Sequence, residues 1–371
     1  MIRPRKAVER LKKYRPPLEG RRGKMRLDFN ENTVGCAPEV ARALRGAINP
    51  EMLTRYPEYA EARRRLAKFF GVAPEEMLLA NGTDDAINLI CDAFVEPGDV
   101  LLVPAPTFPV YEFFHNVAGG KAVRVRYDEN FKLPVNDLLV AANRGARWLA
   151  LANPNNPTGT TVPQTGLRKI LREAPNTLVL VDEAYYDFCG ETALTWIRKY
   201  PNLIVTRTFS KAFGLAALRM GLIFAHKETI DALHRAQNPF VVNSLALLAA
   251  CVAIRHTRHV RRYVKEALRN RQTFCRWLER KGLAYVPSKA NFVLTRVGER
   301  APEIARRLRA QGILVRDWSY DPKLQGYLRF TIGSTAQTLR LTKELEKLQD
   351  LMEIQKGAPR TIPYSTAGWF A

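Results

Sequence analysis

Six short apolar runs alternate with helical patterns through the central part of the chain, and several of them end abruptly in polar residues. The runs are Val100–Val103, Ala122–Val125, Trp148–Ala152, Leu178–Val181, Leu203–Val205 and Leu222–Phe224. Strands that alternate with helices are typical of a largely parallel sheet with helices packed against it. The sequence therefore predicts an α/β fold.

The chain is long enough for a second lobe, because 371 residues exceed the size at which one hydrophobic core stops growing. After about residue 240, two long basic amphipathic helices precede the strand-like stretches NFVLTR, GILVR and YLRFTIG. We predict an N-terminal segment (1–44) that joins a small α+β domain (241–352), a large domain (45–240) and a tail (353–371). The tail is Pro/Gly-rich and is either loose or docked on a neighbour.

Composition restricts the class of protein. Apolar residues make up 46% of the chain and charged residues 25%, with no run of the roughly 18 to 20 apolar residues that a membrane span needs. The N-terminus has no apolar segment typical of a secretory signal, so we expect a cytoplasmic protein. The five cysteines include no CxxC pair and the histidines form no HExxH pattern, so we expect reduced thiols and no bound metal.

The net charge of +22 is the one compositional feature that could indicate nucleic-acid binding. Residues 1–26 hold eleven Lys and Arg, and a second basic run extends from Arg255 to Arg276. The second run fits the exposed face of a long helix, and no helix-turn-helix domain is appended. We therefore expect solvated charge and no nucleic-acid partner, while a nucleic-acid-binding effector sensor remains the alternative from another class.

Polar residues at the strand ends carry the chemistry, because ligands of open α/β sheets bind beyond the carboxyl ends of the strands. There the sequence places an amine (Lys211), a carboxylate behind four aliphatic residues (Asp182), a carboxamide (Asn156) and a phenol (Tyr185). Pyridoxal 5′-phosphate needs a lysine for a Schiff base and an acid near its pyridine nitrogen. For Asp182 taken alone, a helix N-cap is an equally good interpretation.

A phosphate group would also need an anion site. The stretch NGTDDAINLI places Gly82 and Thr83 at the start of an amphipathic helix, where backbone N–H groups bind anions. Thr208, Ser210 and Arg219 could approach the same phosphate from the other side, with Arg219 supplying a full positive charge. A plain helix start and a glycine-rich surface loop are the alternative interpretations of these two segments.

Six motifs, in their order and separations, together resemble those of a known family. They are RYPEYA, NGTDDAI, NPNNPTG, VDEAYYDF, SKAFGLAALRMG and LRFTIG. The chain resembles the class I/II aminotransferases of the pyridoxal-phosphate fold type I over about residues 25 to 350. Within that group, LDFNENTVG, RYPEY and the late VRDW…YLRFTIGS are most similar to histidinol-phosphate aminotransferases.

The resemblance implies roles for the residues around the cofactor. Lys211 is expected to form the Schiff base and Asp182 to pair with the pyridinium nitrogen. Asn156 and Tyr185 would bond the cofactor's phenolic oxygen, with Lys211, Asp182 and Tyr185 as the catalytic set, and Phe108 would stack on the ring. The residues expected to hold the phosphate are Gly82, Thr83, Thr208, Ser210 and Arg219.

The resemblance also implies contacts with the substrate and with a second subunit. Tyr56 of RYPEY would reach the phosphate bound in the partner, which implies a homodimer with composite sites. Asn32, Arg316 and Arg329 are expected to bind the substrate, with the two arginines on its anionic groups. For either arginine, an ordinary surface cation beside a strand is the alternative.

The implied reaction exchanges an amino group between glutamate/2-oxoglutarate and histidinol phosphate/imidazole-acetol phosphate, in histidine biosynthesis. The chain departs from the subfamily near its start, where a tyrosine close to the substrate phosphate is usual. Here Pro17 or Leu18 occupies the corresponding position, and Tyr14 is not clearly equivalent. Aromatic amino acid aminotransferase and threonine-phosphate decarboxylase therefore remain alternatives.

Overall fold

The structure is a computed structural model that describes residues 2–9, 11 and 17–354. The predicted docking of the C-terminal tail and the position of Tyr14 lie outside the described residues. The larger of two sheets has seven strands in the order β2-β8-β7-β6-β5-β3-β4. Its strands are β2 (Met77–Ala80), β3 (Val100–Ala105), β4 (Lys121–Arg126), β5 (Trp148–Ala152), β6 (Leu178–Asp182), β7 (Leu203–Thr208) and β8 (Gly221–Ala225).

All six strands predicted for this sheet are present, and the predicted α/β class is confirmed. Strands β4, β3, β5, β6 and β7 run parallel, whereas β8 is antiparallel to both of its neighbours. Strand β2 was not predicted, and its four residues are all buried between β8 and helices. So short a run carries little periodicity to distinguish a strand from a helix.

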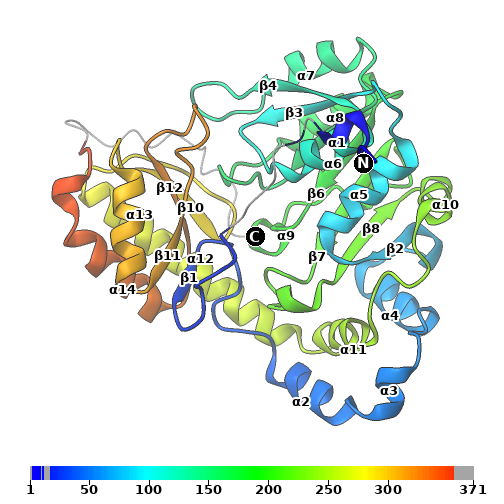
Figure 1. Cartoon of the computed structure of the whole chain (residues 1–371), viewed down its shortest axis with the longest axis horizontal. Coiled ribbons are helices and arrows are strands. Elements are labelled where there is room, and N and C mark those ends of the chain that lie inside the picture. Colours follow the sequence, from blue (N-terminus) through cyan, green and yellow to red (C-terminus); the bar gives the residue numbers. More distant parts are fainter. Residues whose placement is uncertain (1, 10, 12–16, 355–371) are drawn as a thin grey trace.

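Helices cover both faces of the seven-stranded sheet (Figure 1). Successive side chains of a strand point to opposite faces. Accordingly, Leu180 of β6 packs in one core cluster and Val179 and Val181 pack in another. One face is covered by α5 (Gly82–Phe94), α6 (Val110–Ala118) and α10 (Lys227–Ala236), and the other by α4 (Ala60–Phe70), α7 (Val135–Ala142), α8 (Gln164–Glu173) and α11 (Ser244–Ala253).

The smaller sheet has five strands in the order β1-β11-β12-β10-β9. Strand β1 pairs in parallel with β11, so the N-terminal segment completes a sheet that is otherwise formed near the other end of the chain. The strands are β1 (Met25–Leu27), β9 (Tyr285–Val286), β10 (Phe292–Arg296), β11 (Ile313–Asp317) and β12 (Tyr327–Thr331). Helices α13 (Ala301–Ala310) and α14 (Thr335–Glu346) belong to the same lobe (Figure 1).

The long helix α12 (Thr257–Arg280) connects the two lobes (Figure 1). Its first half packs through Tyr263 into the core of the seven-stranded sheet, and its second half packs through Phe274 and Trp277 into the core of the five-stranded sheet. The change of core therefore falls inside α12, and the domain boundary at residue 241 stays a prediction.

The remaining helical segments are α1 (Lys6–Glu9), α2 (Pro38–Ala47), α3 (Pro50–Thr54), α9 (Tyr186–Cys189), and the 3-10 turns η1 (Pro74–Glu76), η2 (Leu194–Trp196), η3 (Ala216–Leu218) and η4 (Gln349–Leu351). Helix α2 packs against α11 through the buried Val40. Among the described residues, none of the helices combines the length and the apolar character needed to cross a membrane.

Candidate active site

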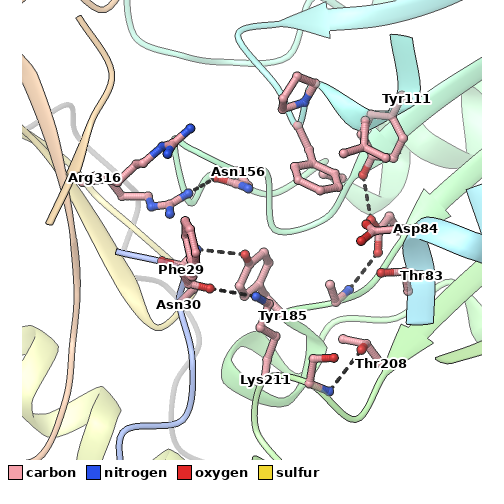
Figure 2. Close-up of a pocket in the computed structure, with 18 of the residues that line it drawn as sticks. Phe29, Asn30, Thr83, Asp84, Tyr111, Asn156, Tyr185, Thr208, Lys211 and Arg316 are labelled. Atoms are coloured by element: carbon pink, nitrogen blue, oxygen red, sulfur yellow. Dashed lines mark hydrogen bonds between the residues drawn. The ribbon is translucent and has the colours of Figure 1, made fainter. Parts of the chain in front are cut away.

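A cavity of about 270 Å³ opens where the carboxyl ends of the central strands face the smaller sheet (Figure 2). Asp182 ends β6, Thr208 ends β7, and Asn156 lies in the turn after β5. Arg316 of β11 and Arg329 of β12 line the cavity from the smaller sheet. The fold thus brings together strand ends that are far apart in the sequence, as expected for a parallel sheet.

Lys211 lies in the loop that follows β7 and projects toward Tyr185 in the cavity (Figure 2). Its Nζ donates a hydrogen bond to the backbone oxygen of Phe29 at 2.9 Å and lies 5.8 Å from the centre of the Tyr185 ring. The segment after β1 therefore fixes the amine from the side of the smaller sheet. Among the described residues, Lys211 forms no salt bridge, so the amine is not neutralised by a carboxylate.

Asp182 is almost completely buried, with 4% of its surface exposed. Burial raises the pKa of this carboxyl group, and hydrogen bonds from Tyr111, Thr206 and the backbone of Ala184 oppose that rise. No salt bridge reaches Asp182 among the residues that the structure describes. A buried carboxylate without a cation is costly, so this position favours a ligand that brings positive charge, as a pyridinium nitrogen does.

Two other predicted residues reach the same cavity. The Tyr185 hydroxyl accepts a hydrogen bond from Asn30 Nδ2 at 2.9 Å, and Asn156 Oδ1 accepts one from the Arg329 guanidinium. Phe108 lines the cavity and packs edge-on against Tyr111, with 5.7 Å between the ring centres. The cavity therefore combines a flat apolar wall with several polar atoms, which suits a planar heteroaromatic ligand.

A pocket for an anion lies at the start of α5. Arg219 has a left-handed backbone (φ 54°), and its guanidinium donates to Ser210 Oγ at 3.4 Å and to Asp84 Oδ2 at 3.3 Å. Gly82, just outside the cavity lining, has a left-handed backbone (φ 82°) that favours glycine, and it lies against that guanidinium. Thr83 and Thr208 complete the lining. Hydroxyl groups, a helix start and an arginine together fit a phosphate group.

Arg329 is the buried cation of the site. It is 4% exposed, and its terminal nitrogens donate to Asn156 Oδ1 and to the backbone oxygen of Asp28. Its Nε is buried and has no hydrogen-bond partner among the described residues. Burial lowers the pKa of the guanidinium from 12.5 to about 10, and the nearby charge of Arg316 adds to the shift. Arg316 and the desolvated Arg329 place two positive charges close together, so this part of the cavity favours an anionic ligand.

Two predicted residues lie elsewhere. Asn32, which we expected to bind substrate, is not part of the cavity lining. Its side chain instead donates to the backbone oxygen of Ala212 and accepts from the backbone N–H groups of Val34 and Gly35, so its polar atoms hold the loop together. Tyr56 is 75% exposed and stacks on Phe240, with 4.2 Å between the ring centres. Within one chain Tyr56 is therefore outside the cavity.

Several residues that line the cavity were not predicted from the sequence. Asn30 precedes Asn32 by two positions, and the structure turns the earlier asparagine inward. Tyr111, in the first turn of α6, follows Phe108 by three positions, and the two rings pack edge-on. Trp318 and Tyr320 follow Arg316. The helical spacing of Tyr111 was readable in the sequence, whereas the choice between the two asparagines was not.

Comparison with known proteins places this geometry in a family. The family model described as aminotransferase class I and II matches residues 22–345, which is most of the chain. The chain belongs to the class I and II aminotransferases. It is 33% identical to histidinol-phosphate aminotransferase 2 of Carboxydothermus hydrogenoformans over 364 residues, covering 94% of this chain and 99% of the relative. It is also 36% identical to the histidinol-phosphate aminotransferase of Symbiobacterium thermophilum, covering 92% and 97%.

Solved aminotransferase structures share the fold. The histidinol-phosphate aminotransferase of Sinorhizobium meliloti, solved in complex with pyridoxal-5′-phosphate, superposes with a TM-score of 0.86 at 26% identity over 94% of this chain and 98% of that one. The L-threonine-O-3-phosphate decarboxylase of Porphyromonas gingivalis superposes with a TM-score of 0.77 at 26% identity over 88% and 99%. The predicted pyridoxal-phosphate fold type I is thereby confirmed.

Proposed function

We propose that this aminotransferase binds pyridoxal 5′-phosphate and exchanges an amino group between glutamate/2-oxoglutarate and histidinol phosphate/imidazole-acetol phosphate, in histidine biosynthesis. One observation carries the proposal. Lys211, the buried carboxylate of Asp182 and two arginines, Arg316 and Arg329, line a single cavity. The full-length similarity to histidinol-phosphate aminotransferases supports the choice of substrate.

The residues of the cavity would hold the cofactor from several sides. Thr83, Thr208, Ser210 and Arg219 would bind its phosphate, and the Phe108 ring would cover one face. When bound, the cofactor supplies an electron-withdrawing ring that stabilises negative charge developing at the substrate Cα. Asp182 would accept a hydrogen bond from the ring nitrogen and keep the proton there.

Lys211 would move the proton. Its Nζ would accept the proton from the substrate Cα and hold it inside the cavity until it is returned. The hydrogen bond to the Phe29 backbone keeps the amine beside the cavity. The Tyr185 hydroxyl, bonded to Asn30, would stabilise the phenolic oxygen of the cofactor together with Asn156.

The arginines would bind the anionic groups of two different substrates in turn. Glutamate carries two carboxylates, and histidinol phosphate carries a phosphate ester. A guanidinium pairs with either anion through two parallel hydrogen bonds. Arg329, which is desolvated before substrate arrives, would gain most from this pairing.

A homodimer with composite sites is also part of the proposal. Tyr56 and Phe240 form an exposed aromatic pair, 75% and 54% accessible in the single chain. Such a pair is better covered by a partner than by water. In such a dimer the Tyr56 hydroxyl of one copy would contact the phosphate bound in the other, which is the role that the family resemblance implies.

A panel of amino donors, followed by 2-oxoglutarate consumption and by carbon dioxide release, tests the proposal. We expect histidinol phosphate to be transaminated with the highest kcat/KM. A preference for phenylalanine or tyrosine would reassign the protein as an aromatic aminotransferase. Release of carbon dioxide from threonine phosphate would favour the decarboxylase, whose solved example shares the fold.

The basic surface and the cellular location complete the proposal. We assign the net charge of +22 to solvent-exposed basic side chains and not to a nucleic-acid-binding surface. Elution from heparin at low salt, together with fast turnover, would support that assignment, whereas retention to high salt would favour the nucleic-acid-binding alternative. A cytoplasmic location fits a biosynthetic enzyme, and fractionation of cells that produce the protein would test it.

A further inference from the structure

The Asp182 carboxylate is held by different donors on its two oxygens. Tyr111 donates to Oδ2 at 2.7 Å (dashed line from Tyr111 in Figure 2). The other oxygen, Oδ1, accepts from the backbone of Ala184 at 3.1 Å and from Thr206 at 3.2 Å. The shortest of these three contacts therefore comes from a phenol on α6, which precedes Asp182 by 71 residues in the sequence.

Tyr111 can act only as a donor in this position. The side chain is completely buried, and burial together with the neighbouring Asp182 charge raises the pKa of its hydroxyl well above 10. The phenol therefore keeps its proton throughout the working range of an enzyme. Its ring lies in the first turn of α6 and packs edge-on against Phe108, so its direction is fixed before any ligand binds.

We propose that Tyr111 is a positioning residue that acts on the cofactor through Asp182. The inference rests on the proposed function, because it concerns the proton shared between Asp182 and the ring nitrogen. A hydrogen bond to a carboxylate stabilises the ionised form. By donating to Oδ2, Tyr111 keeps Asp182 ionised, so the shared proton stays on the ring nitrogen, where it assists the removal of the Cα proton.

Other groups around Asp182 also influence whether its carboxyl group is ionised. Thr206 on β7 donates to the opposite oxygen, and Asp84 at the start of α5 raises the pKa of Asp182 through its negative charge. Asp84 is itself paired with Arg219. The negative charge of Asp84 favours protonation of Asp182, which is the outcome that the Tyr111 hydroxyl opposes.

The test uses Tyr111→Phe, which removes one hydroxyl and keeps the ring. Tyr285→Phe is the matched control, because Tyr285 is also buried and donates to a carboxylate, Glu279, at 2.6 Å, but lies outside the cavity lining. The first readout is the ¹⁵N chemical shift of the ring nitrogen in holoenzyme loaded with labelled cofactor. We expect Tyr111→Phe to move the shift toward the unprotonated form and Tyr285→Phe to leave it in place.

The second readout is kcat. Tyr111→Phe should lower it about tenfold, the loss typical of one hydrogen bond to a charged group. With a cofactor analogue that has carbon in place of the ring nitrogen, the same substitution should change single-turnover rates by less than about twofold. In an Asp182→Asn background it should likewise add nothing, because the residue through which it acts is already altered.

An unchanged ring-nitrogen shift in Tyr111→Phe would overturn the inference, as would an equal loss of rate with the analogue. If Tyr111→Phe fails to retain cofactor, the comparison within Asp182→Asn decides, and an additional loss of cofactor there would assign Tyr111 a purely structural role. Failure of the unmodified protein to bind the cofactor or to transaminate would overturn the proposed function itself, a result separate from these.

Discussion

Replacing Arg329 by alanine should lower kcat/KM for glutamate and for histidinol phosphate alike. The guanidinium is buried beside Arg316, and its pKa is lowered from 12.5 to about 10. At 1.36 kcal/mol per pKa unit, this shift means that the unliganded site destabilises the charged guanidinium by about 3 kcal/mol relative to water. An anionic substrate group relieves that cost, so we expect losses of roughly tenfold to a hundredfold in kcat/KM.

Arg316→Ala provides the contrast. Arg316 is half-buried, and its guanidinium lies 5.7 Å from the centre of the exposed Tyr320 ring, nearer to solvent than Arg329. A more hydrated cation gains less from each ion pair, so its main effect should fall on the doubly charged phosphate ester. We expect Arg316→Ala to weaken histidinol phosphate about tenfold more than glutamate.

The two half-reactions can be measured separately by rapid mixing, with the absorbance of the bound cofactor as the signal. Arg329→Lys keeps the charge but loses the planar fork, and should recover only part of the loss. Because Arg329 bonds Asn156 and the Asp28 backbone, melting temperatures must show that each variant is folded. Equal losses for both substrates in Arg316→Ala, or a loss confined to one substrate in Arg329→Ala, would refute the reasoning.

Three further predictions concern the amine, the dimer and the half-buried Asp187. Lys211→Ala should abolish the lysine–cofactor adduct that borohydride traps, and mass spectrometry that finds the adduct on another lysine would contradict the assignment. Mixing Lys211→Ala chains with chains inactivated at Tyr56 should restore one good site per heterodimer, and no recovery despite proven subunit exchange would indicate self-contained sites. Burial raises the pKa of the Asp187 carboxyl from 3.8 to about 6. The folded protein therefore has its full stability below about pH 4, where this carboxyl is neutral, and loses stability as the pH rises through about 6 and the carboxyl ionises. Asp187→Asn should therefore match the unmodified protein near pH 4 and exceed its free energy of unfolding by up to about 3 kcal/mol above pH 6, and a gap that does not change with pH in urea titrations would contradict this.

The sequence by itself determined the central sheet and the chemical groups that stand beyond the ends of its strands. The residues of β5, β6 and β7 are almost all buried, so their apolar runs end sharply where the chain reaches the cavity. Asp182 is the last residue of β6, and Lys211 lies three residues after the end of β7. Parallel strands carry their carboxyl ends to one edge of the sheet, so order along the chain was enough to predict that the two residues meet.

Only the tertiary structure decided which side chains complete the site from distant segments. Asn30 and Asn32 differ by two positions, yet Asn30 bonds Tyr185 and Thr331 while Asn32 bonds its own loop and Ala212. The pairing of β1 with β11 sets the direction of the segment that carries both asparagines. The two strands are nearly three hundred residues apart, and the hydrophobic pattern of a sequence does not show which distant strands pair.

The same holds for the charges of the site. The sequence shows that Tyr111, Asp182 and Arg329 are present, but a desolvated guanidinium or a phenol bonded to a carboxylate results from packing between α6, β6 and β12. Burial depends on which surfaces meet, and the energy of a charge depends on burial more than on its identity. Chain order therefore determined which chemical groups are available, and the packing of the two lobes decided their electrostatic state.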